Sequence, residues 1–272
     1  MELLVLPSGT LAHRADGAGP ALLLLSANPG DHRDFDAIRP ALSRRFRVHS
    51  FDWPGYGANP APADPASASA MGFARLLREA VKRLKPGPAV VLGNSVGGYA
   101  AVRLALDEPD AVRALALVSP GGFTPHNAFT RAFCRLKGTE GFTRFSSGWF
   151  AAWYLKRRTP LVAQILARAA GEQATPSAVA VNAAVWRSFV DPEHDLRTRA
   201  AHLRVPTWLA FGRHDPVIPA KTDGRVAAST IPGAAMTVFD TGHMPFAEEP
   251  ETFLASLDRF LDRLPPPVAA AA

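Results

Sequence analysis

The chain has 272 residues, 47% of them hydrophobic and 20% charged, which is the composition of a soluble globular protein with one large domain or two small ones. No apolar run approaches the ~20 residues of a membrane-spanning helix, so we expect no membrane span. The formal net charge is +6, but the basic residues are spread along the chain and are not interleaved with aromatic residues, which argues against nucleic-acid binding.

Strands and helices are predicted to alternate over most of the chain. Short apolar runs bounded by turn residues predict strands at Glu2–Leu6, Thr10–Arg14, Ala21–Leu25, Arg47–Phe51, Ala89–Leu92, Ala114–Val118, Thr207–Phe211 and Ala235–Phe239. Apolar residues at helical spacing predict helices over 34–45, Met71–Leu84, Tyr99–Leu106, 222–230 and Glu251–Leu264. The first two strands flank a Pro-Ser-Gly turn and indicate a hairpin rather than a signal peptide. This order indicates an α/β fold with an open, mostly parallel sheet and helices on both faces.

The alternation lapses between residues 123 and 203, where helical periodicity, basic residues and many aromatic residues occur without a convincing strand. We therefore expect a core domain over residues 1–122 and 204–264, a helical lid inserted at 123–203, and a disordered tail at 265–272. In parallel sheets, ligands bind outside the carboxyl ends of the strands. The insertion leaves from that edge and returns to it, so we expect it to cover the site and to govern entry and release.

The predicted strand Ala89–Leu92 runs directly into Gly93-Asn94-Ser95-Val96-Gly97, which fits the G-x-S-x-G nucleophile elbow. A strand that turns at once into a helix brings the two elements so close that side chains at the two glycine positions would collide. The turn lifts the Ser95 hydroxyl clear of the backbone, beside a helix N-terminus that favours negative charge. The motif therefore indicates a serine nucleophile rather than an ordinary glycine-rich turn.

A serine hydroxyl is a weak nucleophile unless a base takes its proton and a third group orients that base. The predicted strand Thr207–Phe211 is followed by Gly212-Arg213-His214-Asp215, and Ala235–Phe239 is followed by Asp240-Thr241-Gly242-His243. Each strand thus delivers a carboxylate or a histidine into the loop after it, in the order serine, acid, histidine.

These motifs together resemble the α/β-hydrolase superfamily, over nearly all of the chain from residue 3 to about residue 264. The resemblance implies an α/β-hydrolase fold with a mostly parallel eight-stranded sheet. It also implies that Ser95 is the nucleophile, that His243 is the general base and then acid, and that Asp215 orients His243. Asp240 is the rival carboxylate.

The resemblance also implies two backbone donors for the oxyanion of a tetrahedral intermediate. One is the amide of Val96, the residue after the nucleophile, and the other comes from the loop after the strand Ala21–Leu25. Family members usually have His-Gly in this loop, whereas this chain has Ser26-Ala27-Asn28-Pro29-Gly30. The amide of Asn28 is the expected second donor, because a backbone donor needs no particular side chain.

The implied function is a serine hydrolase that acts on a small, largely apolar ester or related acyl substrate through an acyl-enzyme intermediate. Two alternatives stay open. Gly93-Asn94-Ser95 and Ser119-Pro120-Gly121-Gly122 also resemble the C–C bond hydrolases of aromatic ring-cleavage products, which act on vinylogous diketo acids. The altered loop at Ser26-Ala27 keeps open a non-catalytic or weakly catalytic ligand-binding protein of the same fold.

The aromatic and basic residues of the lid supply candidates for the substrate pocket, although at helical spacing most of them are expected to pack the lid against the core. The candidates are Phe129, Trp149, Trp153, Trp186 and Arg187, together with Met244 next to the expected base. Arg187 is a candidate for holding a substrate carboxylate or a carrier phosphate.

The sequence also bears on cofactors, location and partners. No metal-ligand spacing is present, and the implied chemistry needs no cofactor. The single cysteine, Cys134, excludes an internal disulfide framework and is typical of a reducing compartment, so we expect a cytoplasmic protein. A small-molecule substrate is the expected partner, and the sequence does not indicate an oligomeric state.

Overall fold

The core of the computed structural model, which describes residues 1–265, is an eight-stranded sheet with the order β1-β2-β4-β3-β5-β6-β7-β8. The strands are β1 (Glu2–Leu6), β2 (Gly9–Asp16), β3 (Ala21–Leu25), β4 (Arg47–Asp52), β5 (Ala89–Asn94), β6 (Val112–Val118), β7 (Thr207–Gly212) and β8 (Ala235–Phe239). Only β2 pairs in the antiparallel sense, with β1 and β4, and every other pair in this sheet is parallel. The predicted α/β fold with a mostly parallel eight-stranded sheet is confirmed.

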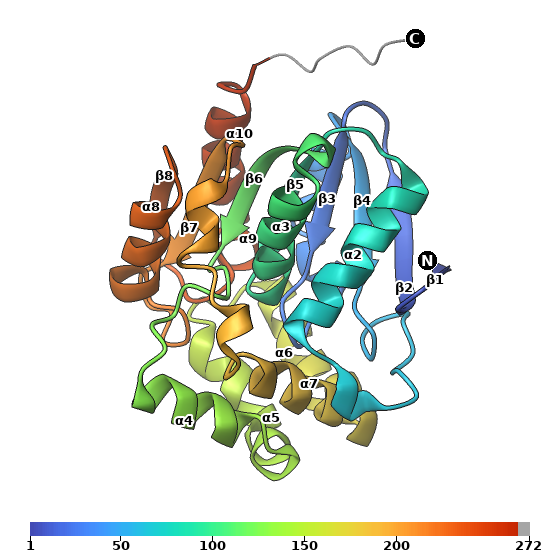
Figure 1. The fold of residues 1–272 in the computed structure, drawn as a ribbon, viewed down its shortest axis with the longest axis vertical. Coiled ribbons are helices and arrows are strands. Elements are labelled where there is room, and N and C mark those ends of the chain that lie inside the picture. The colour runs from blue at the N-terminus through green and yellow to red at the C-terminus, as the bar shows by residue number, and fades with distance from the viewer. Residues whose placement is uncertain (266–272) are drawn as a thin grey trace.

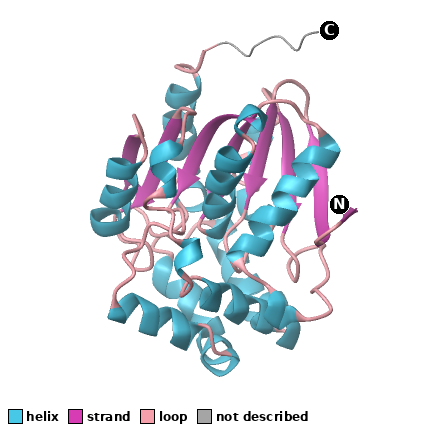
Figure 2. Ribbon diagram, viewed as in Figure 1, coloured by secondary structure: helices cyan, strands magenta, loops and turns pink. Residues whose placement is uncertain are grey.

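Helices cover both faces of this sheet (Figure 2). The α-helices outside the insertion are α1 (Arg39–Leu42), α2 (Ala70–Leu84), α3 (Val96–Asp107), α8 (Arg225–Thr230), α9 (Pro245–Glu248) and α10 (Pro250–Leu261). The 3-10 helices are η1 (His32–Phe35), η2 (Pro65–Ser67), η3 (Pro109–Ala111), η4 (Glu172–Ala174), η5 (Pro192–His194) and η6 (Arg199–His202), and η7 (Ala220–Gly224) is a π-helix.

The central strand β3 explains how one short apolar run builds two cores. All five of its residues are buried. Successive side chains of a strand point to opposite faces. Leu23 and Leu25 accordingly join the core formed with α2 and α3, while Leu22 and Leu24 join the core formed with α1, α9 and α10. A strand that is buried on both faces needs a continuous apolar run, and this is the pattern that the sequence shows.

The helix predicted over residues 34–45 is divided in the structure. Asp31 caps η1 by accepting a hydrogen bond from the backbone N–H of Arg33 at 2.9 Å, and α1 begins only at Arg39. Pro40 has no backbone N–H and fits only the first turn of a helix, so a helix cannot run through it from the preceding segment. The helix predicted over residues 222–230 is similarly divided, into η7 and α8.

Between β6 and β7 the chain forms α4 (Ala128–Lys137), α5 (Glu140–Tyr154), α6 (Pro160–Ala170) and α7 (Pro176–Ser188), and we call residues 123–203 the helical insertion. In Figure 1 its helices lie together below the sheet. None of the helices within residues 1–265 is long and apolar enough to cross a bilayer. The predicted disordered tail lies outside the described residues, apart from Pro265.

A buried pair of histidines lies where β2 pairs with β4. Nε2 of His13 and Nδ1 of His49 are 3.0 Å apart, and both residues are buried. Such a contact needs one ring to donate and the other to accept, so both rings cannot be fully protonated while it persists. Burial and the neighbouring His13 lower the pKa of His49 to about 4, and burial also lowers the pKa of His13.

This pair predicts a loss of stability on acidification. A histidine in the unfolded chain has a pKa of about 6.5. In the folded protein the pKa of His49 is lowered to about 4. Between about pH 6.5 and about pH 4 the unfolded chain therefore binds a proton that the folded protein does not bind. The free energy of unfolding is consequently unaffected by His49 above about pH 6.5 and declines as the pH falls toward about 4. In urea unfolding from neutral pH to about pH 4, His49→Gln should show a shallower decline, by up to ~1.4 kcal/mol per pH unit. Exposed His202→Gln is the control, and equal slopes for all three proteins would contradict the prediction.

Candidate active site

The turn from β5 into α3 holds Ser95 in an unusual backbone conformation. Its φ is 54° and its ψ is −113°, in a region that residues other than glycine rarely occupy. A Cβ on Gly93 would collide with the carbonyl of Gly97, and a Cβ on Gly97 would collide with the carbonyl of Leu25. Because the two glycines have no side chains, β5, the start of α3 and the end of β3 can approach one another closely, as the sequence motif predicts.

Hydrogen bonds on both sides fix this conformation. The N–H of Ser95 donates to the carbonyl of Val118 at 3.0 Å, and the carbonyl of Ser95 accepts from the N–H of Gly121 at 2.9 Å. The buried side chain of Asn94 donates to the carbonyl of Val118 at 3.1 Å and to the carbonyl of His243 at 3.4 Å. The elbow is thus connected both to the end of β6 and to the loop after β8.

The structure brings His243 and Asp215 together. Nδ1 of His243 lies 2.6 Å from Oδ2 of Asp215, and both side chains are buried. The other carboxylate oxygen, Oδ1, accepts from the N–H groups of Val217 at 2.8 Å and Ile218 at 3.1 Å, which fixes the carboxylate. Because a carboxylate only accepts, Nδ1 carries the proton of a neutral ring, and Nε2 is left with a lone pair that can accept a proton.

The loops that carry these two residues pack directly against each other. The N–H of Arg213 donates to the carbonyl of Phe239, and a Cβ on Gly212 would collide with the carbonyl of Gly242. The rival carboxylate Asp240 points elsewhere. It is 59% exposed and pairs with Nε2 of His214 at 2.9 Å and with Arg157 at 3.1 Å. Of the two candidate acids, Asp215 is the one in contact with His243.

The sequence interpretation did not anticipate Glu248, a buried carboxylate beside the His243 loop. Its oxygens accept from the N–H groups of Gly242 at 3.0 Å and Met244 at 3.2 Å, on either side of the histidine. They also accept from the N–H groups of Lys156 at 2.8 Å and Arg157 at 2.9 Å, between α5 and α6. A charged residue directly after the apolar segment Met244–Ala247 is the sequence signal that could have indicated a buried carboxylate.

The backbone of His243 is also held by the insertion. Its N–H donates to the carbonyl of Tyr154, the last residue of α5, at 2.9 Å. The Tyr154 ring meets the imidazole edge to face, with the ring centroids 5.3 Å apart. The insertion therefore contacts the candidate base directly, through both backbone and side chain.

The two residues whose amides are the expected oxyanion donors, Val96 and Asn28, line the same cavity as Ser95. Val96 is the first residue of α3, where backbone N–H groups have no partner within the helix. The Asn28 side chain accepts from the Tyr56 hydroxyl at 2.8 Å and donates to Oδ1 of Asn182 in α7 at 3.1 Å. These bonds fix the loop after β3 in place of the His-Gly pair that family members usually have.

A cavity of about 410 Å³ lies between the core and the insertion. Its lining includes the expected site residues Asn28, Ser95, Val96, Phe129, Trp153 and Trp186. Asp215 and His243 are not among its lining residues, and neither are three of the candidates for the substrate pocket. Trp149 is on the outer face of α5 and 45% exposed, Arg187 donates to the carbonyls of Gly138 and Ala66, and Met244 is buried in the core.

One carboxylate lines this otherwise largely apolar cavity. Asp223, on η7, is only 2% exposed, and it accepts hydrogen bonds from the hydroxyls of Thr124 and, at 2.7 Å, Thr222. Burial raises the pKa of the Asp223 carboxyl. A carboxylate here disfavours an anionic group in the same part of the cavity.

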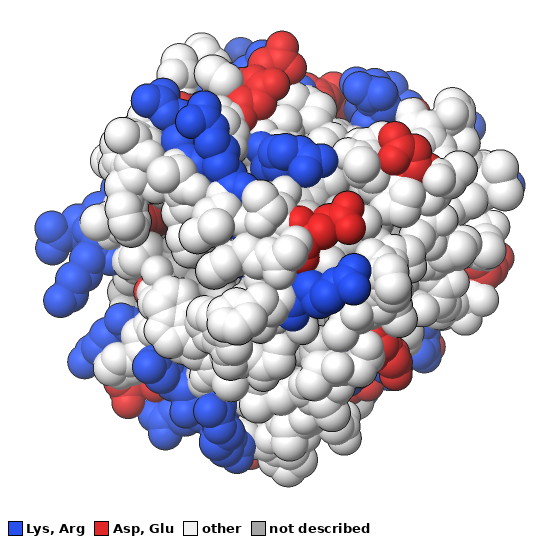
Figure 3. All heavy atoms as spheres, turned by 90° about the horizontal axis from the view of Figure 1, so that it is seen from below, with Lys and Arg blue, Asp and Glu red and all other residues white. Residues whose placement is uncertain are grey.

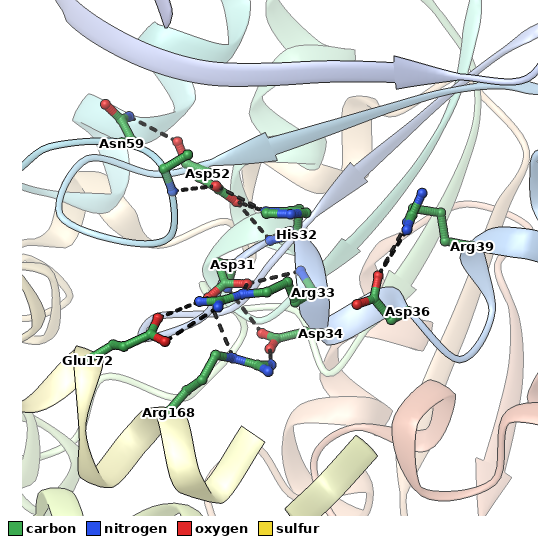
Figure 4. Close-up of polar contacts among 11 residues, drawn as sticks. Asp31, His32, Arg33, Asp34, Asp36, Arg39, Asp52, Asn59, Arg168 and Glu172 are labelled. Carbon is green, nitrogen blue, oxygen red and sulfur yellow. Dashed lines mark hydrogen bonds and ion pairs between the residues drawn. The ribbon is translucent and has the colours of Figure 1, made fainter. Parts of the chain in front are cut away.

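A charged network joins the loop after β3 to the insertion (Figure 4). Arg33 pairs with Asp31 at 2.8 Å and with Glu172 of η4 at 2.6 Å. Arg168 of α6 pairs with buried Asp34 at 2.6 Å. Because Asn28 belongs to the same loop, these ion pairs fix the position of that loop relative to the insertion.

Asp31, His32 and Asp52 lie close enough together to be considered as metal ligands. Their oxygens and nitrogens are already engaged, however. Asp52 accepts from the N–H of His32 at 2.8 Å, from its ring Nδ1 at 2.9 Å, and from the N–H of Ala58 at 2.9 Å, while Asp31 is paired with Arg33. These contacts account for the cluster as a structural feature of the loop.

Comparisons with known proteins identify relatives of the chain. A family model described as alpha/beta hydrolase fold matches residues 20–192. A pimeloyl-(acyl-carrier protein) methyl ester esterase of Edwardsiella ictaluri is 30% identical over 261 residues, which cover 90% of this chain and 95% of that protein. A solved hydrolase from Pseudomonas aeruginosa PA01 is similar with a TM-score of 0.81 at 25% identity, covering 96% of this chain and 97% of its own. An enol-lactonase from Burkholderia xenovorans LB400 shares the fold with a TM-score of 0.82 at 21% identity, covering 96% of this chain and all of its own.

The contacts of Glu248 predict that its charge stabilises the protein. Glu248→Gln places an amide NH₂ group among backbone N–H donors and should lower the free energy of unfolding by about 2–3 kcal/mol. The measurement is chemical unfolding, with exposed Glu251→Gln as the control, for which we expect a change within about 0.5 kcal/mol. Equal unfolding midpoints for Glu248→Gln and the unaltered protein would contradict this role.

Proposed function

The chain belongs to the α/β-hydrolase family, and we propose that it is a serine hydrolase that cleaves a small, largely apolar carboxylic ester. The observation that carries the proposal is the contact of Asp215 with Nδ1 of His243, in loops packed against each other and tied to the Ser95 elbow. The proposed roles are nucleophile for Ser95, general base and acid for His243, and orienting carboxylate for Asp215.

In the proposed reaction, Ser95 Oγ attacks the ester carbonyl carbon while Nε2 of His243 takes the hydroxyl proton. The N–H groups of Val96 and Asn28 stabilise the oxyanion of the tetrahedral intermediate. The C–O bond to the alcohol breaks as His243 returns the proton to the leaving oxygen, which leaves an acyl-enzyme. Water, deprotonated by His243, then attacks this ester, releases the acid and restores the serine.

The cavity supports a neutral acyl group. Among its described lining residues, the only Lys or Arg is the exposed Arg131, and the buried Asp223 is a carboxylate. The alternative C–C bond hydrolase binds a diketo acid, whose carboxylate would lack a buried cation here.

The Edwardsiella relative is named for hydrolysis of a methyl ester. Of that name, only ester hydrolysis enters the present proposal. In this proposal the helical insertion acts as the lid, and its residues Phe129, Trp153 and Trp186 select the acyl group.

Ser95→Ala tests the proposed nucleophile. The variant should lose covalent labelling by a fluorophosphonate, and kcat/KM for p-nitrophenyl butyrate should fall by at least ~10³-fold, because no other group attacks the carbonyl. Intact-mass spectrometry and initial rates measure both effects.

Ser119→Ala is the matched control, since Ser119 also has a positive φ, of 40°, after the neighbouring strand β6. It should keep both labelling and activity. Full esterase activity in folded Ser95→Ala would reject the proposal, whereas absence of turnover in the unaltered protein with saturable binding of an apolar ligand would favour the binding-only alternative.

Asp223→Asn tests the neutral-acyl preference. Two substrates of equal length are compared, a monomethyl dicarboxylate, which carries a negative charge, and an uncharged methyl ester. Removing the Asp223 carboxylate should raise kcat/KM for the charged substrate relative to kcat/KM for the uncharged one by about tenfold, or ~1.4 kcal/mol. Burial raises the pKa of Asp223, so the assay is run at mildly alkaline pH, which favours the ionised form. Asp110→Asn, an exposed carboxylate outside the cavity lining, is the control, and an unchanged ratio for Asp223→Asn would contradict the prediction.

A further inference from the structure

Four aromatic side chains of the insertion are exposed to solvent. Among the described Phe and Trp residues, the exposed ones are Phe129, Phe145, Trp149 and Trp153, and their relative exposures are 78%, 74%, 45% and 44%. All four lie on α4 and α5, and Leu136 of α4 is also 48% exposed. Soluble monomers rarely expose large apolar side chains in a group unless the group contacts a partner or a membrane.

The spacing on α5 shows that this exposure is a continuous stripe. Phe145, Trp149 and Trp153 are four residues apart, so they share one face of the helix. The Phe145 and Trp149 rings are 6.4 Å apart, centroid to centroid. The opposite face packs inward through Phe150 and Tyr154, which are buried in the core. Packing of α5 against the protein therefore does not account for the outer aromatic residues.

Unpaired basic side chains accompany the aromatic stripe. Arg131 and Arg135 on α4 and Arg144 on α5 are exposed, and none of them forms an ion pair within residues 1–265. The two helices carry one acidic residue, Glu140. Figure 3 views this end of the molecule and shows a broad, mostly uncharged area with Lys and Arg gathered mainly along its left side and a few Asp and Glu side chains near its middle and right. Such a surface is complementary to a partner that is apolar inside and anionic outside.

The same face meets the cavity. Phe129, Arg131 and Trp153 belong both to this face and to the cavity lining beside Ser95. The face formed by α4 and α5 is therefore continuous with the wall of the cavity.

We propose that α4 and α5 form a docking surface for an anionic phospholipid bilayer. Trp and Phe side chains suit the boundary between headgroups and acyl chains, and basic residues near an anionic leaflet are attracted to its headgroups. A symmetric dimer through this face would instead bring the unpaired arginines of both copies together, which opposes self-association. The proposed docking does not depend on the proposed hydrolysis. If both hold, an apolar substrate reaches Ser95 from the lipid.

Vesicle sedimentation tests the docking surface. The protein should bind vesicles of phosphatidylcholine mixed with phosphatidylglycerol, bind vesicles of phosphatidylcholine alone much less, and be released by high salt. Phe145→Ser/Trp149→Ser and, separately, Arg135→Gln/Arg144→Gln should each lower the partition coefficient by about tenfold or more. None of these residues lines the cavity, so hydrolysis of a water-soluble ester should be unchanged.

Val5→Ser/Met236→Ser is the matched control. It removes exposed apolar side chains, 69% and 39% exposed, from β1 and β8, and should leave binding intact. Quenching of tryptophan fluorescence by brominated phosphatidylcholine in vesicles that also contain phosphatidylglycerol, measured on the unaltered protein, gives an answer that does not depend on how the variants fold. Because Ser95→Ala should bind vesicles normally, failure of docking and failure of the proposed hydrolysis are distinguishable.

Three results would overturn the proposal. The first is the absence of both sedimentation with anionic vesicles and quenching. The second is a dimer in sedimentation equilibrium that Phe145→Ser/Trp149→Ser dissociates, which would make the face a self-association surface. The third is saturable binding of an acidic acyl carrier protein at this face without any vesicle binding.

Discussion

The backbone of Ser95 is the constraint on which the other features of the site depend. Holding a serine at a φ of 54° costs about 1–3 kcal/mol, and such a conformation persists only where its surroundings determine it. Here the N–H and the carbonyl of Ser95 are both bonded to the segment that ends β6, at Val118 and Gly121. The hydroxyl consequently projects from the carboxyl edge of the sheet at the start of α3, where the loops after β3, β7 and β8 also meet.

The helical insertion is connected by hydrogen bonds to two of these loops. Asn182 of α7 bonds to Asn28 in the loop after β3, and the junction of α5 and α6 bonds to Glu248 beside His243. A displacement of α5 therefore also displaces the backbone of His243, because the last carbonyl of α5 accepts from it. In the proposed account, docking of α4 and α5 at a lipid surface acts on the same helices that position the base.

The sequence predicts the sheet well and the insertion's side-chain directions poorly, for physical reasons. A run such as Ala21–Leu25 is apolar throughout because both faces are covered, so local composition identifies the strand. The predicted helix over residues 34–45 is divided because Pro40 lacks a backbone N–H. The spacing of apolar residues, on which the prediction is based, does not depend on that N–H. Trp149 and Trp153 share a helical stripe, yet only Trp153 lines the cavity, because α5 turns only one end of that stripe toward it. The role of Glu248 depends on contacts between distant segments, which helical or strand periodicity does not encode.

The central claim is that the Ser95 hydroxyl attacks the carbonyl while the amides of Val96 and Asn28 hold the oxyanion. A crystal structure of the protein after reaction with a dialkyl phosphate ester such as paraoxon tests it most directly, because the phosphoryl group imitates the tetrahedral intermediate. The account predicts a covalent bond from phosphorus to Ser95 Oγ, with the phosphoryl oxygen ~3 Å from both amide nitrogens. A phosphoryl group on another side chain, or an oxygen that points away from both amides, would contradict it.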